Sequence, residues 1–208
     1  MCIFYNLTGK CISKEVFIQS YSYIYYFKNN FATENNIEYL YNKQEKTADD
    51  YIEFLRWKVG DRKDSGDITT QYGNKIDTKG IVLIFNELNQ PNQIDRHSQV
   101  ETIYKKIISQ NVTNIGSVYA LALLSFFTGG QEPIYDKFAD IALSAISDNQ
   151  HDFRSPINYI EFPDKKNIEK VMKRYESYKQ RLTGLFGGSW KTSRDVDRAL
   201  WTYGHLFI

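Results

Sequence analysis

The feature that most constrains the fold is the apolar run from Ser117 to Phe127, SVYALALLSFF. Nearly every residue in the run is apolar, so a helix formed there would be hydrophobic on all sides and would have to be buried. The run is far shorter than the ~18 residues that a membrane-spanning helix needs. Gly129 and Gly130 follow it and favour a stop. We therefore predict a central core helix on which the other helices pack.

A short polar turn, formed by Asn114, Ile115, Gly116 and Ser117, precedes the apolar run. Glycine allows positive φ and a close approach of the backbone, and asparagine tolerates positive φ better than most residues. The N–H groups at the start of the following helix would point outward and could bind phosphate. The same pattern also fits an ordinary connection between two helices with no ligand, because such turns are common.

Caps and apolar periods predict helices along most of the chain. Thr47 with Asp50 has the pattern of a capping box, and Gly60 would end that helix. The polar stretch 60–79 lacks an apolar period and is predicted to be a long loop. The run Ile81–Phe85 fits a strand or a helix, and a helix is favoured because no partner strand is evident. The predicted helices are 13–27, 33–41, 47–58, 77–85 (stopped by Pro91), 98–109, 117–127, 136–146, 164–182 and 192–203 (stopped by Gly204).

Composition and charge set broad limits. A chain of 208 residues is long enough for one domain or for two small interleaved lobes. Its net charge of +1 does not by itself indicate a nucleic-acid binder. Basic residues outnumber acidic ones after residue 164, which fits either a phosphate-contacting helix face or an ordinary solvated one.

Few residues suggest a metal or a cofactor. Cys2 and Cys11 are the only cysteines, and no cysteine or histidine cluster has zinc-binding spacing, so neither a metal nor a disulfide framework is expected. The histidines His97, His151 and His205 are scattered. No P-loop or dinucleotide fingerprint is present, and we expect no cofactor. The N-terminus lacks the pattern of a signal peptide, so the sequence predicts a cytoplasmic protein without a membrane partner.

The turn before the core helix resembles the hairpin of the helix-hairpin-helix DNA glycosylase superfamily, whose pattern reads G-V-G-x-K-x-A. Asn114 and Gly116 fall on the two glycines, Ile115 on the hydrophobic residue and Ala120 on the alanine. The lysine that bifunctional members use as a nucleophile is replaced here by Val118. The resemblance therefore implies a hairpin that binds DNA backbone, without Schiff-base chemistry.

Two further segments resemble the same superfamily. The PIYD sequence at 133–136 is similar to the family's P-V-D turn, whose aspartate is catalytic, and it follows the hairpin at a similar spacing. The segment RDVDRALWTYG at 194–204 is similar to one in bacterial proteins of the 8-oxoguanine glycosylase fold. The resemblance covers about 51–203 of the chain. It implies an all-α fold, a multi-helix orthogonal bundle with a helix-hairpin-helix motif.

The resemblance assigns roles to specific residues. Asp136 would be the catalytic carboxylate, which stabilises the positive charge that develops on the sugar or activates water. The bland alternative is that Asp136 only caps the helix that follows it, although both roles can hold at once. The implied contacts to the DNA backbone are Asn114, Gly116 and Ser117, and further candidates for pocket or phosphate contacts are Tyr135, Lys137, Trp190 and Lys191.

Two functions remain open at this point. One is a protein that binds double-stranded DNA and excises a base by monofunctional N-glycosidic hydrolysis with Asp136. The other is a catalytically inactive helical module of the same fold that binds protein or nucleic acid. Val118 and the near-neutral charge favour the inactive module, whereas the presence of Asp136 favours the enzyme.

Overall fold

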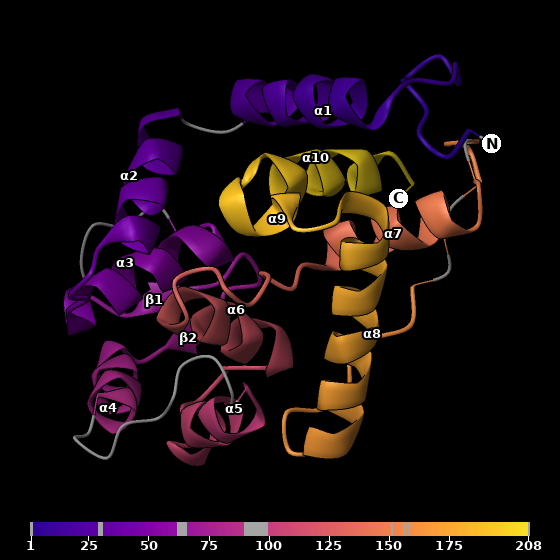
Figure 1. Cartoon of the computed structure of the whole chain (residues 1–208). Helices are drawn as coiled ribbons and strands as arrows, with labels where there is room; N and C mark the ends of the chain where they lie inside the picture. The colour runs from indigo at the N-terminus through magenta and orange to yellow at the C-terminus, as the bar shows by residue number, and fades with distance from the viewer. Residues whose placement is uncertain are drawn as a thin grey trace. The chain divides into compact units, whose positions relative to one another are not determined.

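Helices make up most of the protein, as the sequence predicts (Figure 1). The computed structural model describes residues 2–28, 31–61, 66–89, 100–150, 152–155, 157 and 159–207. The helices are α1 (Lys14–Lys28), α2 (Phe31–Asn42), α3 (Ala48–Val59), α4 (Thr78–Leu88), α5 (Val100–Ser109), α6 (Ser117–Phe127), α7 (Lys137–Ser147), α8 (Ile168–Phe186), α9 (Ser189–Thr192), α10 (Asp195–Gly204) and the 3₁₀ turn η1 (His205–Phe207). None of the helices in these ranges has both the length and the apolar character that crossing a membrane requires.

The chain divides into two compact units, and α8 contributes to both. Unit 1 contains Met1–Ala32, Tyr135–Glu161 and Arg174–Ile208, and unit 2 contains Thr33–Ile134 and Phe162–Lys173. Unit 1 is therefore built from three separate stretches of sequence. Unit 2 is almost continuous, with one later segment added to it.

The core of unit 2 forms around α6, which confirms the prediction of a buried central helix. Most of its side chains are fully buried, including those of Leu121 and Leu124. The ring of Phe126 stacks on that of Phe54 from α3, with centroids 4.4 Å apart and planes 5° from parallel. Tyr51 of α3 meets the same ring edge-on at 5.1 Å. Aromatic packing therefore fixes α6 against α3.

Local capping sets several helix boundaries where the sequence predicts them. Thr47 and Asp50 form the capping box of α3, and Gly60 ends the helix at φ 73°. Asp77 caps α4 by accepting a hydrogen bond from the backbone N–H of Lys79 at 2.9 Å. The Ile81–Phe85 run is thereby confirmed as helix. Pro91 is predicted to end α4 and Ser98 to begin α5. Both residues lie outside the described residues.

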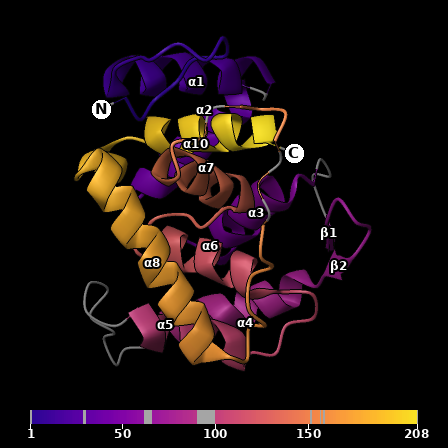
Figure 2. The same ribbon diagram turned by 90° about the vertical axis from the view of Figure 1, so that its right-hand side faces the viewer.

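The long loop predicted at 60–79 is partly wrong. Ile68–Thr69 (β1) and Lys75–Ile76 (β2) form a small antiparallel sheet, which Figure 2 labels at the edge of the ribbon. Ile68 and Ile76 are paired and fully buried, so two isolated isoleucines anchor the segment to unit 2. Two-residue strands are too short to give a period-2 pattern in the sequence.

Unit 1 is organised around α1, α7 and α10. In both Figure 1 and Figure 2, α1 runs alongside α10. Phe17 and Tyr21 of α1 each meet the ring of Tyr203 edge-on at 5.1 Å. On the other side, α7 approaches α10 so closely that a Cβ at Gly204 would lie 1.9 Å from the carbonyl oxygen of Phe138. Helix α10 ends at Gly204, as predicted, and the lack of a side chain at Gly204 also allows the close approach of α7.

Three helix starts differ from the sequence prediction. Helix α2 begins at Phe31, before the predicted cap Thr33. Helix α8 begins at Ile168, and the Asn167 side chain accepts a hydrogen bond from the N–H of Lys170, whereas Asp164 forms an earlier turn. Helix α10 begins at Asp195, because Thr192 belongs to the short α9. Among the described residues, only at α8 does a different cap-type side chain, Asn167, take over, whereas the N-cap of α10 is Arg194, which makes no side-chain cap bond.

Candidate functional site

The turn between α5 and α6 belongs to unit 2, and two neighbouring residues of the turn hold it in place. Asn114 adopts φ 62°, as its residue type predicts, and its Nδ2 donates to the backbone oxygen of Lys75 at 2.7 Å. The next residue, Ile115, is buried. The turn is therefore anchored by one apolar side chain and by one hydrogen bond to β2, which leaves Asn114 itself at the surface.

Gly116 occupies the N-cap position of α6. Its φ is −85°, so the expectation that this glycine supplies a positive φ is wrong. Helix α6 receives no side-chain cap from it, and a Cβ built at Gly116 would meet no atom within 4 Å. Neither the backbone conformation nor the packing of the described residues therefore explains why this position is glycine.

Ser117 and Val118 begin α6. The Ser117 hydroxyl is buried and donates to the backbone oxygen of Pro163, so its side chain is engaged inside unit 2. Lys165, from the same segment, places its Nζ 3.2 Å from the backbone oxygen of Val112. A lysine that the sequence analysis did not single out therefore lies beside the turn. Asp164 follows Pro163 and adds a negative charge to the same segment.

Asp136 is the N-cap of α7 in unit 1. Its Oδ1 accepts a hydrogen bond from the backbone N–H of Phe138 at 2.8 Å, which confirms the capping role predicted for it. The residue is half-buried. Of its predicted neighbours, Lys137 is exposed and its Nζ lies 5.1 Å from the ring centre of Tyr159.

Tyr135 is not open to a ligand, because it is fully buried. Its hydroxyl donates to Oδ2 of Asp140 at 2.6 Å and lies 3.1 Å from the hydroxyl of Tyr159. Burial, followed by the charge of Asp140, raises the pKa of Tyr135 well above its usual value. Tyr135 is therefore a neutral hydrogen-bond donor that positions the residues after it.

Asp140 is the centre of a buried ionic cluster that the sequence analysis missed. Only 3% of the residue is exposed. Arg174 binds its Oδ2 at 2.9 Å, and Arg181 binds its Oδ1. Arg174 also lies 5.2 Å from the ring centre of Tyr159. The cluster joins α7 to α8 within unit 1, and its two arginines stand seven residues apart on one face of α8.

Trp190 and Lys191 belong to α9 in unit 1. Trp190 is half-buried, and its indole N–H donates to the hydroxyl of Thr183 at 3.3 Å. Lys191 is exposed and lies 5.1 Å from the Trp190 ring centre. Trp190 contacts the end of α8 through Thr183, and none of the described contacts of Trp190 or Lys191 involves Asp136.

The predicted site residues therefore fall into separate groups. Asn114, Gly116 and Ser117 form the turn of unit 2, whereas 135–137 begin α7 in unit 1 and 190–191 lie in α9. That the turn and Asp136 act on the same DNA, as the resemblance implies, stays a prediction. No group of three metal-ligating side chains occurs among the described residues, and His97 and His151 lie outside them.

Comparisons of the chain with protein-family models, with curated proteins and with solved structures find no match.

Proposed function

We propose that the chain binds the backbone of double-stranded DNA through the turn between α5 and α6. The observation that carries this proposal is Gly116, a glycine whose conformation any residue could adopt and whose missing side chain nothing in the described structure would contact. A glycine there is accounted for if a ligand approaches the backbone from outside. The N–H groups of the first turn of α6 and the charge of Lys165 favour an anion such as phosphate.

The turn supplies only a modest, salt-dependent affinity. For each B-DNA phosphate that the protein neutralises, the logarithm of the binding constant falls by about 0.9 for every tenfold rise in salt concentration. One helix N-terminus and one lysine correspond to a few such contacts. Because these contacts go to backbone phosphates, they position the protein and do not read sequence.

A Gly116→Asp variant tests the DNA contact directly. Aspartate is a preferred N-cap residue, so the free energy of unfolding should stay the same or rise slightly. A carboxylate at this position would repel phosphate, and we expect duplex affinity to fall at least about tenfold, measured by fluorescence anisotropy at low salt. Gly188→Asp is the matched control, since Gly188 also precedes a helix and has open space around it. Equal affinity of both variants and the wild-type protein would reject the turn as the DNA contact.

We further propose that Asp136 takes part in excision of a base from that DNA. In monofunctional hydrolysis the bond between the sugar C1′ and the base nitrogen breaks, and the electron pair leaves with the base. The carboxylate stabilises the positive charge on the sugar or accepts a proton from the attacking water, whose oxygen bonds to C1′. The base must first leave the duplex stack. The proposed role adds to the structural one that Asp136 has in capping α7 through Oδ1.

The second candidate, an inactive DNA-binding or protein-binding module, is favoured by one specific observation. The Asp136 carboxylate already has a structural role, since it caps α7. Val118 stands where bifunctional glycosylases carry lysine, and it also favours the inactive module. If the inactive module binds DNA, it uses the same turn and differs from the enzyme only in chemistry.

An Asp136→Asn variant separates the two candidates. Asparagine caps helices about as well as aspartate, so stability should hardly change. If Asp136 is catalytic, excision over a panel of damaged bases should fall about 10²- to 10⁴-fold. Asp77→Asn, the same change at the N-cap of α4, controls for capping. Undiminished excision by the Asp136 variant would reject its catalytic role, and absence of excision by the wild-type protein on every duplex would support the inactive module.

A further inference from the structure

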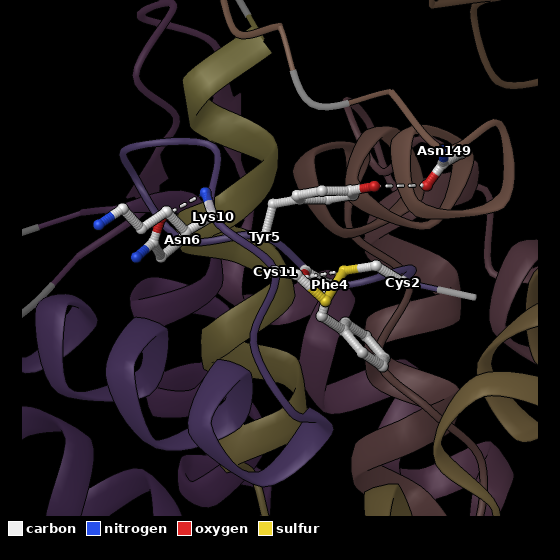
Figure 3. Close-up of a disulfide and its surroundings, with 7 residues drawn as sticks. All are labelled: Cys2, Phe4, Tyr5, Asn6, Lys10, Cys11 and Asn149. Atoms are coloured by element: carbon white, nitrogen blue, oxygen red, sulfur yellow. Dashed lines mark hydrogen bonds between the residues drawn. A yellow bond between two sulfur atoms is a disulfide. The ribbon is translucent and has the colours of Figure 1, made fainter.

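The N-terminal segment carries a feature that the proposed DNA contact does not use. No disulfide framework is predicted from the sequence, yet Cys2 and Cys11 form a disulfide (Figure 3). It closes a short hairpin in unit 1, in which Tyr5 and Cys11 form an antiparallel bridge. The hairpin turns at Gly9, whose φ is 72°.

The closed hairpin places the aromatic ring of Phe4 on the core of unit 1. Phe4 is buried, and its ring centre lies 4.9 Å from that of Phe17 in α1 and 5.6 Å from that of Phe186 in α8. The backbone oxygen of Tyr5 accepts a hydrogen bond from Tyr21 at 3.0 Å. Loss of the segment would expose aromatic surface and leave the buried Tyr21 hydroxyl without this acceptor.

The remaining bonds of the hairpin lie near the surface. Asn6 Oδ1 accepts from the N–H of Lys10 at 2.9 Å, and the Asn6 N–H donates to the Lys10 oxygen at 2.9 Å. The Tyr5 hydroxyl donates to Asn149 Oδ1 at 3.0 Å, as Figure 3 shows. An isolated hairpin held by such bonds is marginally stable in water. Closure of the segment therefore depends on Phe4 and on the disulfide.

The disulfide is accessible to exchange. Cys11 is exposed and Cys2 is half-buried, so a small thiolate can reach the Cys11 sulfur. Cys2 Sγ lies 3.2 Å from the backbone oxygen of Phe4. A disulfide sulfur has no proton to donate, so this contact becomes a hydrogen bond only when Cys2 is a thiol. The geometry therefore offers the released Cys2 thiol an acceptor.

We propose that the Cys2–Cys11 pair is a redox-sensitive clasp that seats the N-terminal segment on the aromatic core of unit 1. A small dithiol opens it in two steps. Its first thiolate bonds to the Cys11 sulfur, and Cys2 leaves as a thiolate that takes up a proton. Its second thiolate then displaces Cys11, so the dithiol is oxidised to a cyclic disulfide and the two cysteines are reduced. Opening frees residues 2–12 and exposes Phe17 and Phe186.

Hydrogen–deuterium exchange of the full-length protein, with and without dithiothreitol, tests the clasp. Closing a loop of this length disfavours open states by about 10- to 100-fold, so reduction should speed exchange at Asn6 and Ile12 by that factor. Exchange in α6 should not change. A Cys2→Ser/Cys11→Ser variant should exchange at the reduced rate in either buffer.

Two results would overturn the clasp. One is equal exchange of residues 2–12 in the oxidised and reduced protein. The other is the recovery of two free thiols after the protein is equilibrated with oxidised glutathione and denatured in the presence of a thiol reagent. A Phe4→Ala variant provides a second check, because its segment should exchange faster even with the disulfide intact.

Discussion

A Gly204→Ala substitution is expected to lower the free energy of unfolding by about 3 kcal/mol or more. Overpacking of a well-packed core typically costs about 1–3 kcal/mol, and occasionally more. Here the added Cβ would lie 1.9 Å from the carbonyl oxygen of Phe138 and 2.6 Å from its carbonyl carbon. These are backbone atoms of α7, which cannot rotate away as a side chain can. Helices α7 and α10 would therefore have to separate, and chemical denaturation would measure the loss.

Gly184→Ala is the matched control for that substitution. Gly184 also lies within a helix, α8, but a Cβ there would meet no atom within 4 Å. Alanine is a better helix former than glycine, so this variant should be stabilised by about 0.5–1 kcal/mol. Similar stabilities of the two variants would contradict the close approach of α7 to α10.

The second large effect is expected for Asp140→Asn, which should destabilise the protein by about 3 kcal/mol. The change keeps the shape of the side chain but removes the charge that Arg174 and Arg181 share. Removing one partner of a buried ion pair costs about 3–5 kcal/mol, because the other charge stays buried. The arginine side chains are 22% and 28% exposed, so they regain some hydration and the lower end of that range applies.

Asp152→Asn provides the comparison for Asp140. The Asp152 side chain is 53% exposed and that of its partner Arg154 is 94% exposed. Exposed ion pairs contribute little, because water and salt screen them. We expect the denaturation midpoint of this variant to stay at the wild-type value. A loss as large as that of Asp140→Asn would mean that charge removal, and not burial of the cluster, sets the cost.

The sequence predicts those elements whose signals are local. The apolar composition of 117–127 suffices for a buried helix, and the Thr47–Asp50 capping box lies within four residues of sequence. The sheet formed by 68–69 and 75–76 gives no comparable signal, because only two isoleucines anchor it. The starts of α2, α8 and α10 differ from the predicted caps, because a cap-type residue in the sequence does not by itself set where a helix begins.

The candidate site is less accessible to sequence reasoning. The capping role of Asp136 was predicted, since it depends on the two residues that follow. The Asp140 cluster was missed, because its arginines come from a helix more than thirty residues further along the chain. A signal did exist. Asp140 is the one charged residue in the run 138–146, and an acid in a helix that is apolar around most of its surface needs a buried cationic partner.

The three-part construction of unit 1 has a consequence for synthesis of the chain on the ribosome. Helix α1 emerges early, with Phe17, Tyr21 and Tyr25 forming an aromatic stripe. Its main neighbour, α10, is translated only after residues 29–194. For most of translation, only the N-terminal hairpin can cover part of that stripe, through Phe4 and Tyr5. A nascent chain of this design should depend on chaperones at α1, whereas unit 2 can begin to assemble around α6 well before translation ends.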